Sequence, residues 1–365
     1  MGILVGTDEA GYGPQLGPLV VAATAWEVGE EEVGGRRSEV REEQGDCGLG
    51  SRGIQSAIRN RKSAIGMAPV DLYRSLKNVV SRVPSDRKVA IADSKALYKP
   101  GLGLRQLERG LHAVFAAMER SFDCWASLVD GVSADPWGHH RALSWHDGFN
   151  RSLPVDAEGD ELEKCGERLG RGCEKAGVRP LVVRARLVFP AEFNELCERY
   201  GSKGEALSHV TIGLLKEVVE AVRGSGGGEE RPLAEASSPV FAVCDKHGGR
   251  NFYTALLQHH FPEHWVRSVF ESRAESRYEW GGEEERVEVV FRTQGEEFLP
   301  TALASMTAKY LRELSMRAFN EFWCARVADL RPTAGYYGDS SRFRREVTAM
   351  QRELGIEDRV MWRER

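Results

Sequence analysis

Apolar residues follow two different periods along this chain, and both predict secondary structure. Residues 2–7 and 17–26 are nearly continuous apolar runs joined by a glycine-rich connection, which is typical of strands buried on both faces. Further strands are predicted over 124–132, 179–189, 239–245 and 286–293. Helical spacing of apolar residues predicts helices over 70–83, 104–121, 206–223, 250–261 and 300–325. Strands and helices that intermix along the whole length predict an α/β domain with a helical C-terminal end.

Three segments interrupt this pattern and are interpreted as insertions. They lie near 28–66, 132–176 and 224–238, and they are glycine-rich, highly charged or without clear apolar period. The segments between them account for the predicted sheet and its helices.

Composition narrows the class of protein. The formal net charge of −5 over 365 residues argues against general adhesion to nucleic acid, so any polyanion binding needs a local basic patch or bound cations. The seven cysteines form no CxxC pair, and we expect a reduced, cytoplasmic protein without a secretory leader. No apolar run approaches membrane-spanning length, so no membrane partner is expected.

Carboxylates stand where strands are predicted to end. Asp8 and Glu9 close the first strand and are followed by Gly11 and Gly13, which let the chain turn and approach a ligand closely. Asp245 closes the strand over 239–245, and ligand sites in open α/β sheets favour such strand ends. Each feature alone is equally typical of a solvated turn.

A helix face offers the fourth carboxylate. Ser305, Lys309 and Glu313 are spaced four apart and share one face of the helix predicted over 300–325. Converging carboxylates repel one another unless cations neutralise them, and hard oxygen ligands suit Mg²⁺ or Mn²⁺. Two such ions about 4 Å apart can activate water and stabilise the leaving oxygen in phosphodiester cleavage.

Five segments, in order, resemble motifs of the ribonuclease HII family (type 2 ribonuclease H). "GTDEAGYGPQLGPLVVAAT" is similar to its first motif, and "DSKAL" resembles its Asp-Ser-Lys-x-Leu. "VFAVCDKHGGRN" takes the place of the strand with the third acidic residue, and "QGEEFLPTALASMTAKYLRE" is similar to its Lys-Gly-Asp…Ala-Ala-Ser-Ile-x-Ala-Lys helix. "AGYYGDSSRF" is similar to a Gly-Tyr-Gly-Thr segment whose tyrosine packs on a nucleic-acid sugar.

The resemblance implies a ribonuclease H-like mixed five-stranded sheet with flanking helices, in a catalytic domain over 1–310 and a C-terminal helical segment over 311–365. It implies cleavage of the RNA strand of RNA–DNA hybrids with Mg²⁺ or Mn²⁺. A monomer is the default expectation. The implied metal-binding and catalytic carboxylates are Asp8, Glu9, Asp245 and Glu313. The implied substrate-binding residues are Gly11, Tyr12, Gly13, Ser94, Lys95, Ser305, Lys309 and Tyr336.

Departures from the family pattern bear on substrate choice. Tyr12 stands where the family has arginine or lysine in the loop that recognises the ribonucleotide–deoxyribonucleotide junction, so cleavage at a single embedded ribonucleotide is not part of the expectation. Glu313 replaces an aspartate, and Lys246 replaces a glycine. Two other functions stay open: a catalytically impaired nucleic-acid-binding protein, and a nuclease of this fold that acts on DNA or structured RNA.

Histidines form a separate group of candidates. "WGHHRALSWHDGF" contains His139, His140 and His146, but their spacing fits no zinc template, so surface histidines are expected. His247, two residues after Asp245, is either an assisting group or a solvent-facing turn residue.

Overall fold

The structure is a computed structural model, and it describes residues 1–29, 70–99, 101–134, 143–224, 234 and 238–364. The strands of the main sheet are β1 (Gly2–Ala10), β2 (Leu19–Val28), β5 (Val178–Val188), β6 (Val240–Asp245), β7 (Arg267–Glu271), β8 (Glu275–Trp280) and β9 (Val287–Arg292). Two short strands, β3 (Val80–Ser81) and β4 (Val89–Ala90), pair with each other.

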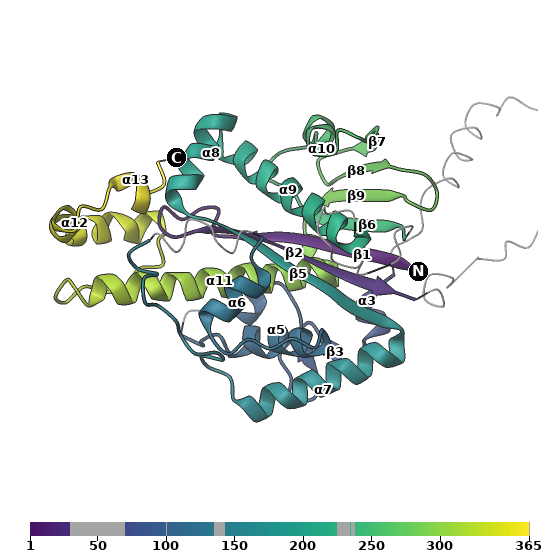
Figure 1. Cartoon of the computed structure of the whole chain (residues 1–365), viewed down its shortest axis with the longest axis horizontal. Helices are drawn as coiled ribbons and strands as arrows, with labels where there is room; N and C mark the ends of the chain where they lie inside the picture. The colour runs from purple at the N-terminus through teal and green to yellow at the C-terminus, as the bar shows by residue number, and fades with distance from the viewer. Residues whose placement is uncertain (30–69, 100, 135–142, 225–233, 235–237, 365) are drawn as a thin grey trace, which may run out of the picture.

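The helices flank this sheet and extend beyond it (Figure 1). They are α3 (Leu72–Ser75), α4 (Ser94–Leu97), α5 (Arg105–Ala117), α6 (Trp125–Val132), α7 (Gly159–Ala176), α8 (Pro190–Tyr200), α9 (Lys203–Arg223), α10 (Thr254–His260), α11 (Leu299–Cys324), α12 (Tyr337–Glu353) and α13 (Asp358–Met361), with a 3₁₀ turn η3 (Gly295–Glu297).

The main sheet has the strand order β5-β2-β1-β6-β9-β8-β7. β1 pairs antiparallel with β2 and parallel with β6, and β6 pairs parallel with β9. The remaining pairs are antiparallel, so the sheet is mixed. Because β1 and β6 are parallel neighbours, their carboxyl ends reach the same edge of the sheet. This edge carries the site described below.

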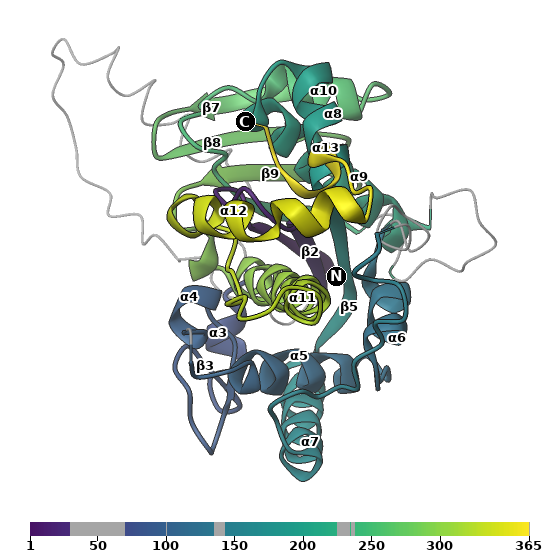
Figure 2. The same ribbon diagram turned by 90° about the vertical axis from the view of Figure 1, so that its left-hand side faces the viewer.

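Helices cover both faces of the sheet, as two buried apolar clusters require. On one face α11 lies against β1 and β2, with α5 and α7 beyond it, and their side chains form one cluster with those strands. On the other face α8, α9 and α10 pack on the strands in a second cluster. Figure 2 shows α11 end-on between the strands and α5, with α8, α9 and α10 on the opposite side.

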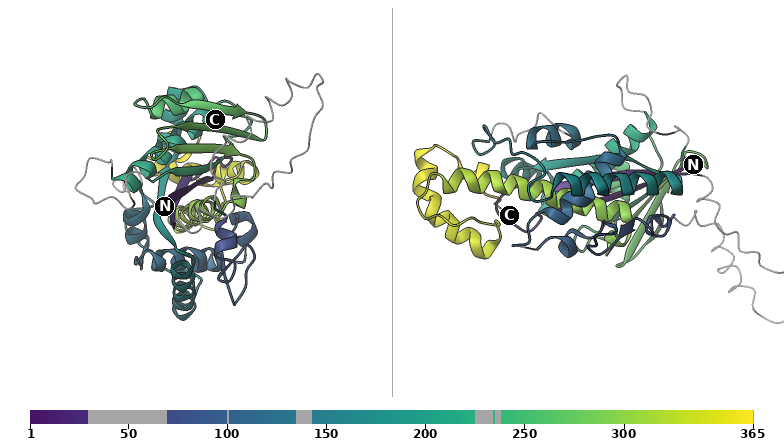
Figure 3. Two further views of the ribbon diagram at one scale, coloured as in Figure 1. Left: turned by 90° about the vertical axis from the view of Figure 1, so that its right-hand side faces the viewer. Right: turned by 90° about the horizontal axis from the view of Figure 1, so that it is seen from below.

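A third apolar cluster joins the C-terminal helices to the sheet's edge. Its members include Leu16 from the loop after β1, Phe319 and Trp323 from α11, Phe343 from α12 and Trp362 after α13. α12 and α13 lie at one end of the molecule, where α12 packs beside the C-terminal end of α11 (Figure 3). The predicted boundary at 310/311 falls inside the continuous helix α11, and the two-domain division stays a prediction.

The structure confirms the predicted class, a mixed sheet with flanking helices and a helical C-terminal extension, and gives seven strands where five were expected. The two additional strands are β7 (RSVFE) and β8 (ESRYEW), whose polar and charged residues leave no apolar run that would mark a strand. Within the described residues, no helix is both long enough and apolar enough to cross a membrane.

Between 124 and 176 one predicted strand was wrong and one helix was missed. Residues 125–132 form α6 instead of a strand, because the buried positions Trp125, Leu128, Val129 and Val132 follow helical spacing. The segment 132–176, interpreted as an insertion without period, contains the 18-residue helix α7. Its buried stripe of Cys165, Gly166, Leu169 and Cys173 contains a single large apolar side chain, which hid the helical period. Most of the segments near 28–66 and 224–238 lies outside the described residues.

Candidate active site

Three carboxylates meet where β1 and β6 end. In the parallel register Thr7 lies beside Cys244, so Asp8 and Asp245 are the next residues on adjacent strands. Asp8 is 7% exposed, and its carboxylate accepts the backbone N–H of Glu9 at 2.8 Å. Glu9 and Asp245 are partly buried. The predicted convergence of these three residues is therefore what the sheet topology produces.

A fourth carboxylate comes from the turn after β9. Asp245 pairs with Arg292 at the end of β9, and η3 follows directly. The backbone N–H of Gly295 points at Asp245 Oδ1 at 3.5 Å, and Glu296 is close enough to raise the pKa values of both Glu9 and Asp245. Sequence reasoning missed Glu296, although it stands in "QGEE", the counterpart of the Lys-Gly-Asp element in the family motif.

The pKa values of Asp8, Glu9 and Asp245 are raised because the groups are buried or partly buried and their negative charges lie close together. Burial and the neighbouring carboxylate of Glu9 raise the pKa of Asp8 well above its usual range, against a lowering hydrogen bond from Ser305. Burial and Asp245 raise the pKa of Glu9 to about 7, and burial and Glu296 raise the pKa of Asp245 to about 6. Oxygen ligands that repel one another and are partly buried suit hard divalent cations, so this donor set fits Mg²⁺ or Mn²⁺.

Lys95 brings a positive charge to this group and lowers the pKa values of Glu9 and Asp245 against the larger raising effects. Its Nζ lies 3.9 Å from Glu296 Oε1 and 4.0 Å from Asp93 Oδ2, and its side chain is 83% exposed. Partial burial lowers the pKa of Lys95, but the carboxylates of Asp93, Glu296, Asp8 and Asp245 outweigh this and raise it. An exposed ammonium group at the rim of an acidic pocket can contact a phosphate without blocking the pocket.

Ser94 and Ser305 connect the short helix α4 to α11 beneath the carboxylates. Their hydroxyl oxygens are 3.1 Å apart, and the backbone N–H of Ser94 points at Ser305 Oγ at 3.3 Å. Both residues are buried, so Ser305 supports Asp8 from below instead of facing solvent. Asp93 caps α4 by accepting the N–H of Lys95, which fixes Lys95 at the rim.

The start of α11 lies directly on the backbone of β1. A Cβ on Gly6 would lie 2.0 Å from the backbone nitrogen of Thr301, so only glycine fits at this crossing. The hydroxyl of Thr24 donates to the carbonyl of Pro300, and that of Thr301 to the carbonyl of Val243. These contacts fix the height of α11 over the strands and thereby place Ser305 against Asp8.

Glu313 does not join the other carboxylates. It lies eight residues beyond Ser305, about 12 Å further along the helix axis, and its oxygens bind Lys309 Nζ at 2.6 Å and the hydroxyl of Tyr98 at 2.8 Å. Lys309 also lies 4.4 Å from the ring centre of Tyr98. The structure corrects the expectation that Glu313 completes the site, because a helix face spaced by four covers too great a length to meet one strand end. Glu296 takes that place.

The loop after β1 is held from below by two buried arginines. Arg312, from α11, donates to the carbonyl groups of Leu16, Pro18 and Ala334. Arg363, from the C-terminal segment, donates to the carbonyl groups of Gly11, Pro14 and Gly17. Gly11 has φ +84°, and a Cβ there would lie 2.6 Å from the carbonyl oxygen of Pro18. These hydrogen bonds hold the loop in a tight turn. Gly13 is exposed, and the space where a Cβ would lie is open.

The C-terminal segment brings Tyr336 to the same loop. The N–H of Gln15 donates to the carbonyl of Gly335 at 2.8 Å, and Tyr336 follows with 55% of its surface exposed. The predicted substrate-binding residues Gly11 and Gly13 therefore lie in the loop after β1, and Tyr336 lies beside this loop. The loop directly follows the strand end that carries Asp8 and Glu9.

Tyr12 has a cationic neighbour that the sequence did not indicate. The Nζ of Lys203, the first residue of α9, lies 5.0 Å from the centre of the Tyr12 ring. Burial and the negative charge of Glu9 raise the pKa of the Tyr12 hydroxyl, which therefore stays protonated. A tyrosine with a lysine over its face presents an aromatic surface and a positive charge together.

Two of the candidate histidines are buried: His146, which was expected at the surface, and His247, for which an assisting role and a solvent-facing turn were both left open. His247 accepts or donates a hydrogen bond with Ser208 Oγ at 2.9 Å, and burial lowers its pKa to about 3. His146 stacks on Trp125 and bonds Ser315 Oγ at 3.2 Å. His139 and His140 lie outside the described residues.

Comparison with known proteins gives structural neighbours at low similarity. No family model matches the chain, and no curated protein does. The ribonuclease HII of Archaeoglobus fulgidus, solved in complex with PCNA, is 15% identical with a TM-score of 0.41, over 100% of this chain and 94% of that one. Ribonuclease H2 of Pyrococcus horikoshii OT3 is 12% identical with a TM-score of 0.39, over 98% and 92% of the chains. Bst-RNase HIII, solved with Mn²⁺, is 12% identical with a TM-score of 0.36, over 100% and 66%.

Proposed function

We propose that this protein is a divalent-metal-dependent endonuclease that hydrolyses the RNA strand of RNA–DNA hybrids. The observation that supports it is the group Asp8, Glu9, Asp245 and Glu296. The first three residues stand at the ends of the central strands β1 and β6, and Glu296 stands in the turn after β9. The motif resemblance supports the substrate class. A protein that only binds polyanions gains nothing from clustered negative charge, which favours an enzyme.

These four carboxylates would hold Mg²⁺ or Mn²⁺. Two such ions, when bound, would supply a nucleophilic water and stabilise the charge on the leaving oxygen. Before metal enters, the raised pKa values of Asp8, Glu9 and Asp245 mean that protons compete for the site near neutral pH. Activity should therefore rise with pH as these carboxylates lose their protons.

Residues around the rim would bind the nucleic-acid backbone. Lys95 would pair with a phosphate next to the carboxylates, and Tyr336 would stack on a sugar from the opposite side of the loop. Ser305 positions Asp8 and has no free hydroxyl face for substrate, because it lies buried against Ser94. The ion pair with Glu313 neutralises the charge of Lys309, so Lys309 would contact substrate only if this ion pair were broken.

Four labelled duplexes test the proposal with Mg²⁺ or Mn²⁺ present: RNA–DNA hybrid, DNA with one ribonucleotide, plain DNA and plain RNA. Cutting of the hybrid that disappears in Asp8→Asn supports the proposal. Binding without cutting would instead identify a catalytically impaired binding protein, and cutting of plain DNA or RNA would identify a different nuclease.

Three matched carboxylate variants test the composition of the site. Glu296→Gln should lower kcat/KM by more than about 100-fold, as loss of a metal ligand does. Glu297→Gln is the control, since this neighbour is 68% exposed and lies 3.8 Å from Arg292. Glu313→Gln should cost less than about tenfold, because its partners are Lys309 and Tyr98. The reverse order for Glu296 and Glu313 would overturn the assignment.

A further inference from the structure

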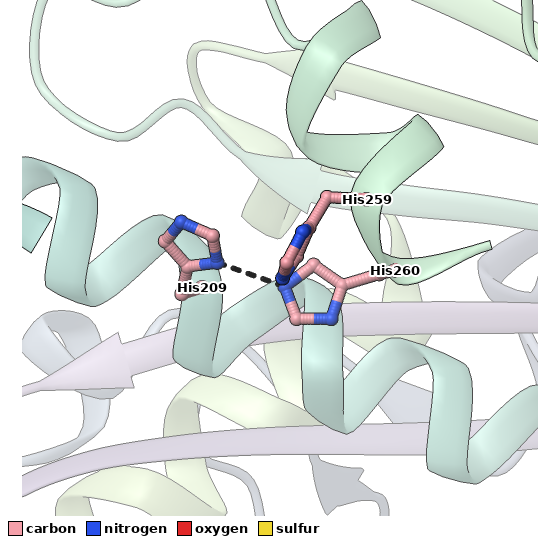
Figure 4. Close-up of side chains that lie close together, drawn as sticks. All are labelled: His209, His259 and His260. Carbon is pink, nitrogen blue, oxygen red and sulfur yellow. Dashed lines mark hydrogen bonds between the residues drawn. The ribbon is translucent and has the colours of Figure 1, made fainter. Parts of the chain in front are cut away.

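Three histidines form a cluster on the face of the sheet covered by α9 and α10. His209 comes from the second turn of α9, and His259 and His260 are the last two residues of α10. Each offers a ring nitrogen, and the three nitrogens lie within 4.8 Å of one another. Figure 4 shows the rings facing one another, with Nδ1 of His209 3.1 Å from Nε2 of His260. Nothing in the proposed nuclease chemistry uses these residues.

The spacing of the nitrogens fits a tetrahedral metal. Zinc–imidazole bonds of about 2.0–2.1 Å at tetrahedral angles place two ligand nitrogens about 3.3 Å apart. The observed 3.1 Å between His209 and His260 is near this value, and the centre of the His259 ring lies 5.2 Å and 5.1 Å from theirs. A small rotation of the exposed His259 side chain would complete a set of three nitrogens.

The surroundings fix two of the three rings before any ion arrives. Tyr200 stacks on His209, with ring centres 3.7 Å apart and planes at 14°. His260 packs on α9 at Gly213, where a Cβ would be at an ordinary van der Waals distance of 3.5 Å from its Cε1 atom. A preorganised pair of imidazoles loses little conformational freedom when it binds a metal.

The cluster is also in the protonation state that metals require. Burial and the neighbouring His259 lower the pKa of His209, and burial and His209 lower the pKa of His260 to about 4. Both rings are therefore neutral near pH 7, so metal binding requires no net loss of a proton from them. The proton shared between His209 Nδ1 and His260 Nε2 would move to the other nitrogen of its ring, which frees both facing nitrogens for the metal. The nearest acidic influence on His209 is Glu205, which is itself paired with Arg250.

We propose that His209, His259 and His260 bind one divalent transition-metal ion, with zinc as the best fit, and leave a fourth position for water. Imidazole nitrogens prefer zinc and related ions over Mg²⁺, so this site is chemically distinct from the carboxylate site. The ion would join α9 to α10. α9 starts beside Tyr12 and bonds His247 through Ser208, so the metal would stabilise the helix layer behind the carboxylate edge.

The test is zinc binding by the full-length protein, first stripped with chelator and then dialysed against Zn²⁺ in excess Mg²⁺, which occupies the carboxylates. We expect one zinc per chain, a Co²⁺ derivative with the visible bands of tetrahedral coordination, and a higher Tm with zinc. His209→Asn and His260→Asn should each weaken binding more than about 100-fold. His264→Asn is the matched control, because His264 lies nearby but contacts Glu263 and Trp280.

The outcomes separate this site from the carboxylates. Asp245→Asn should keep the zinc, and circular dichroism should show that the cluster variants are folded. Retention of zinc by His260→Asn would overturn the proposal, as would its loss in Asp245→Asn. Failure of the wild-type protein to bind zinc would leave only a hydrogen-bonded histidine cluster. None of these results depends on nuclease activity.

Discussion

Repulsion within the carboxylate group should lower the stability of the metal-free fold, and the substitution Asp245→Asn tests this. Burial and Glu296 disfavour the charged form of Asp245, opposed by the N–H groups of Gly295 and Lys246 and by Lys95. Asparagine keeps an oxygen that accepts these N–H groups but carries no charge. We therefore expect the substitution to stabilise the metal-free fold.

The size of the effect follows from the pKa of Asp245, which moves from 3.8 to about 6. At about 1.4 kcal/mol per unit, ionised Asp245 costs the folded state about 3 kcal/mol at about pH 8. This is an upper bound, because Lys95 loses an attractive partner in the variant. A raised carboxylate pKa favours folding below the unfolded value and loses that benefit as pH rises through the folded value. At about pH 4 the expected gain from Asp245→Asn is only about 0.5 kcal/mol.

Urea unfolding of both proteins in chelator, at about pH 8 and about pH 4, measures these differences. Glu297→Gln serves as the control, since its exposed side chain should change stability little at either pH. Adding Mg²⁺ should stabilise the wild type more than Asp245→Asn, because the variant lacks a ligand. Equal stability of the two proteins at about pH 8, or the same gain at both pH values, would refute the account of repelling carboxylates.

Three other changes test the elements that position the site. Gly6→Ala should destabilise the protein by about 1–3 kcal/mol or more in urea unfolding, because its Cβ would lie 2.0 Å from the backbone of α11, whereas Gly13→Ala, with nothing within 4 Å, should cost little. Lys203→Gln should weaken hybrid binding several-fold in a salt titration and reduce its salt dependence, since it removes the cation beside Tyr12; unchanged binding at low salt would contradict that role. Arg363→Met should lower the free energy of unfolding, measured by thermal unfolding, by about 3 kcal/mol or more, because three carbonyl groups lose a buried hydrogen-bond donor. A decrease below about 1 kcal/mol would contradict the role of Arg363 in holding the loop after β1.

Local signals in the sequence determined much of this protein. The apolar runs before Asp8 and Asp245 predict strands because a strand buried on both faces must be apolar throughout, and glycines after each mark where the chain turns. The long helices α9 and α11 follow from their own apolar period. Where burial used small residues, as in α7, the period was too weak to recognise.

Only the tertiary structure decided which distant residues meet. The parallel register of β1 and β6 brings Asp8 beside Asp245, and the turn after β9 adds Glu296, whereas the rise of α11 carries Glu313 away to Lys309 and Tyr98. Lys203 reaches Tyr12 only because α9 packs across the sheet. Sequence spacing gives direction within one element, but contact between elements depends on strand order and packing height, which no local pattern encodes.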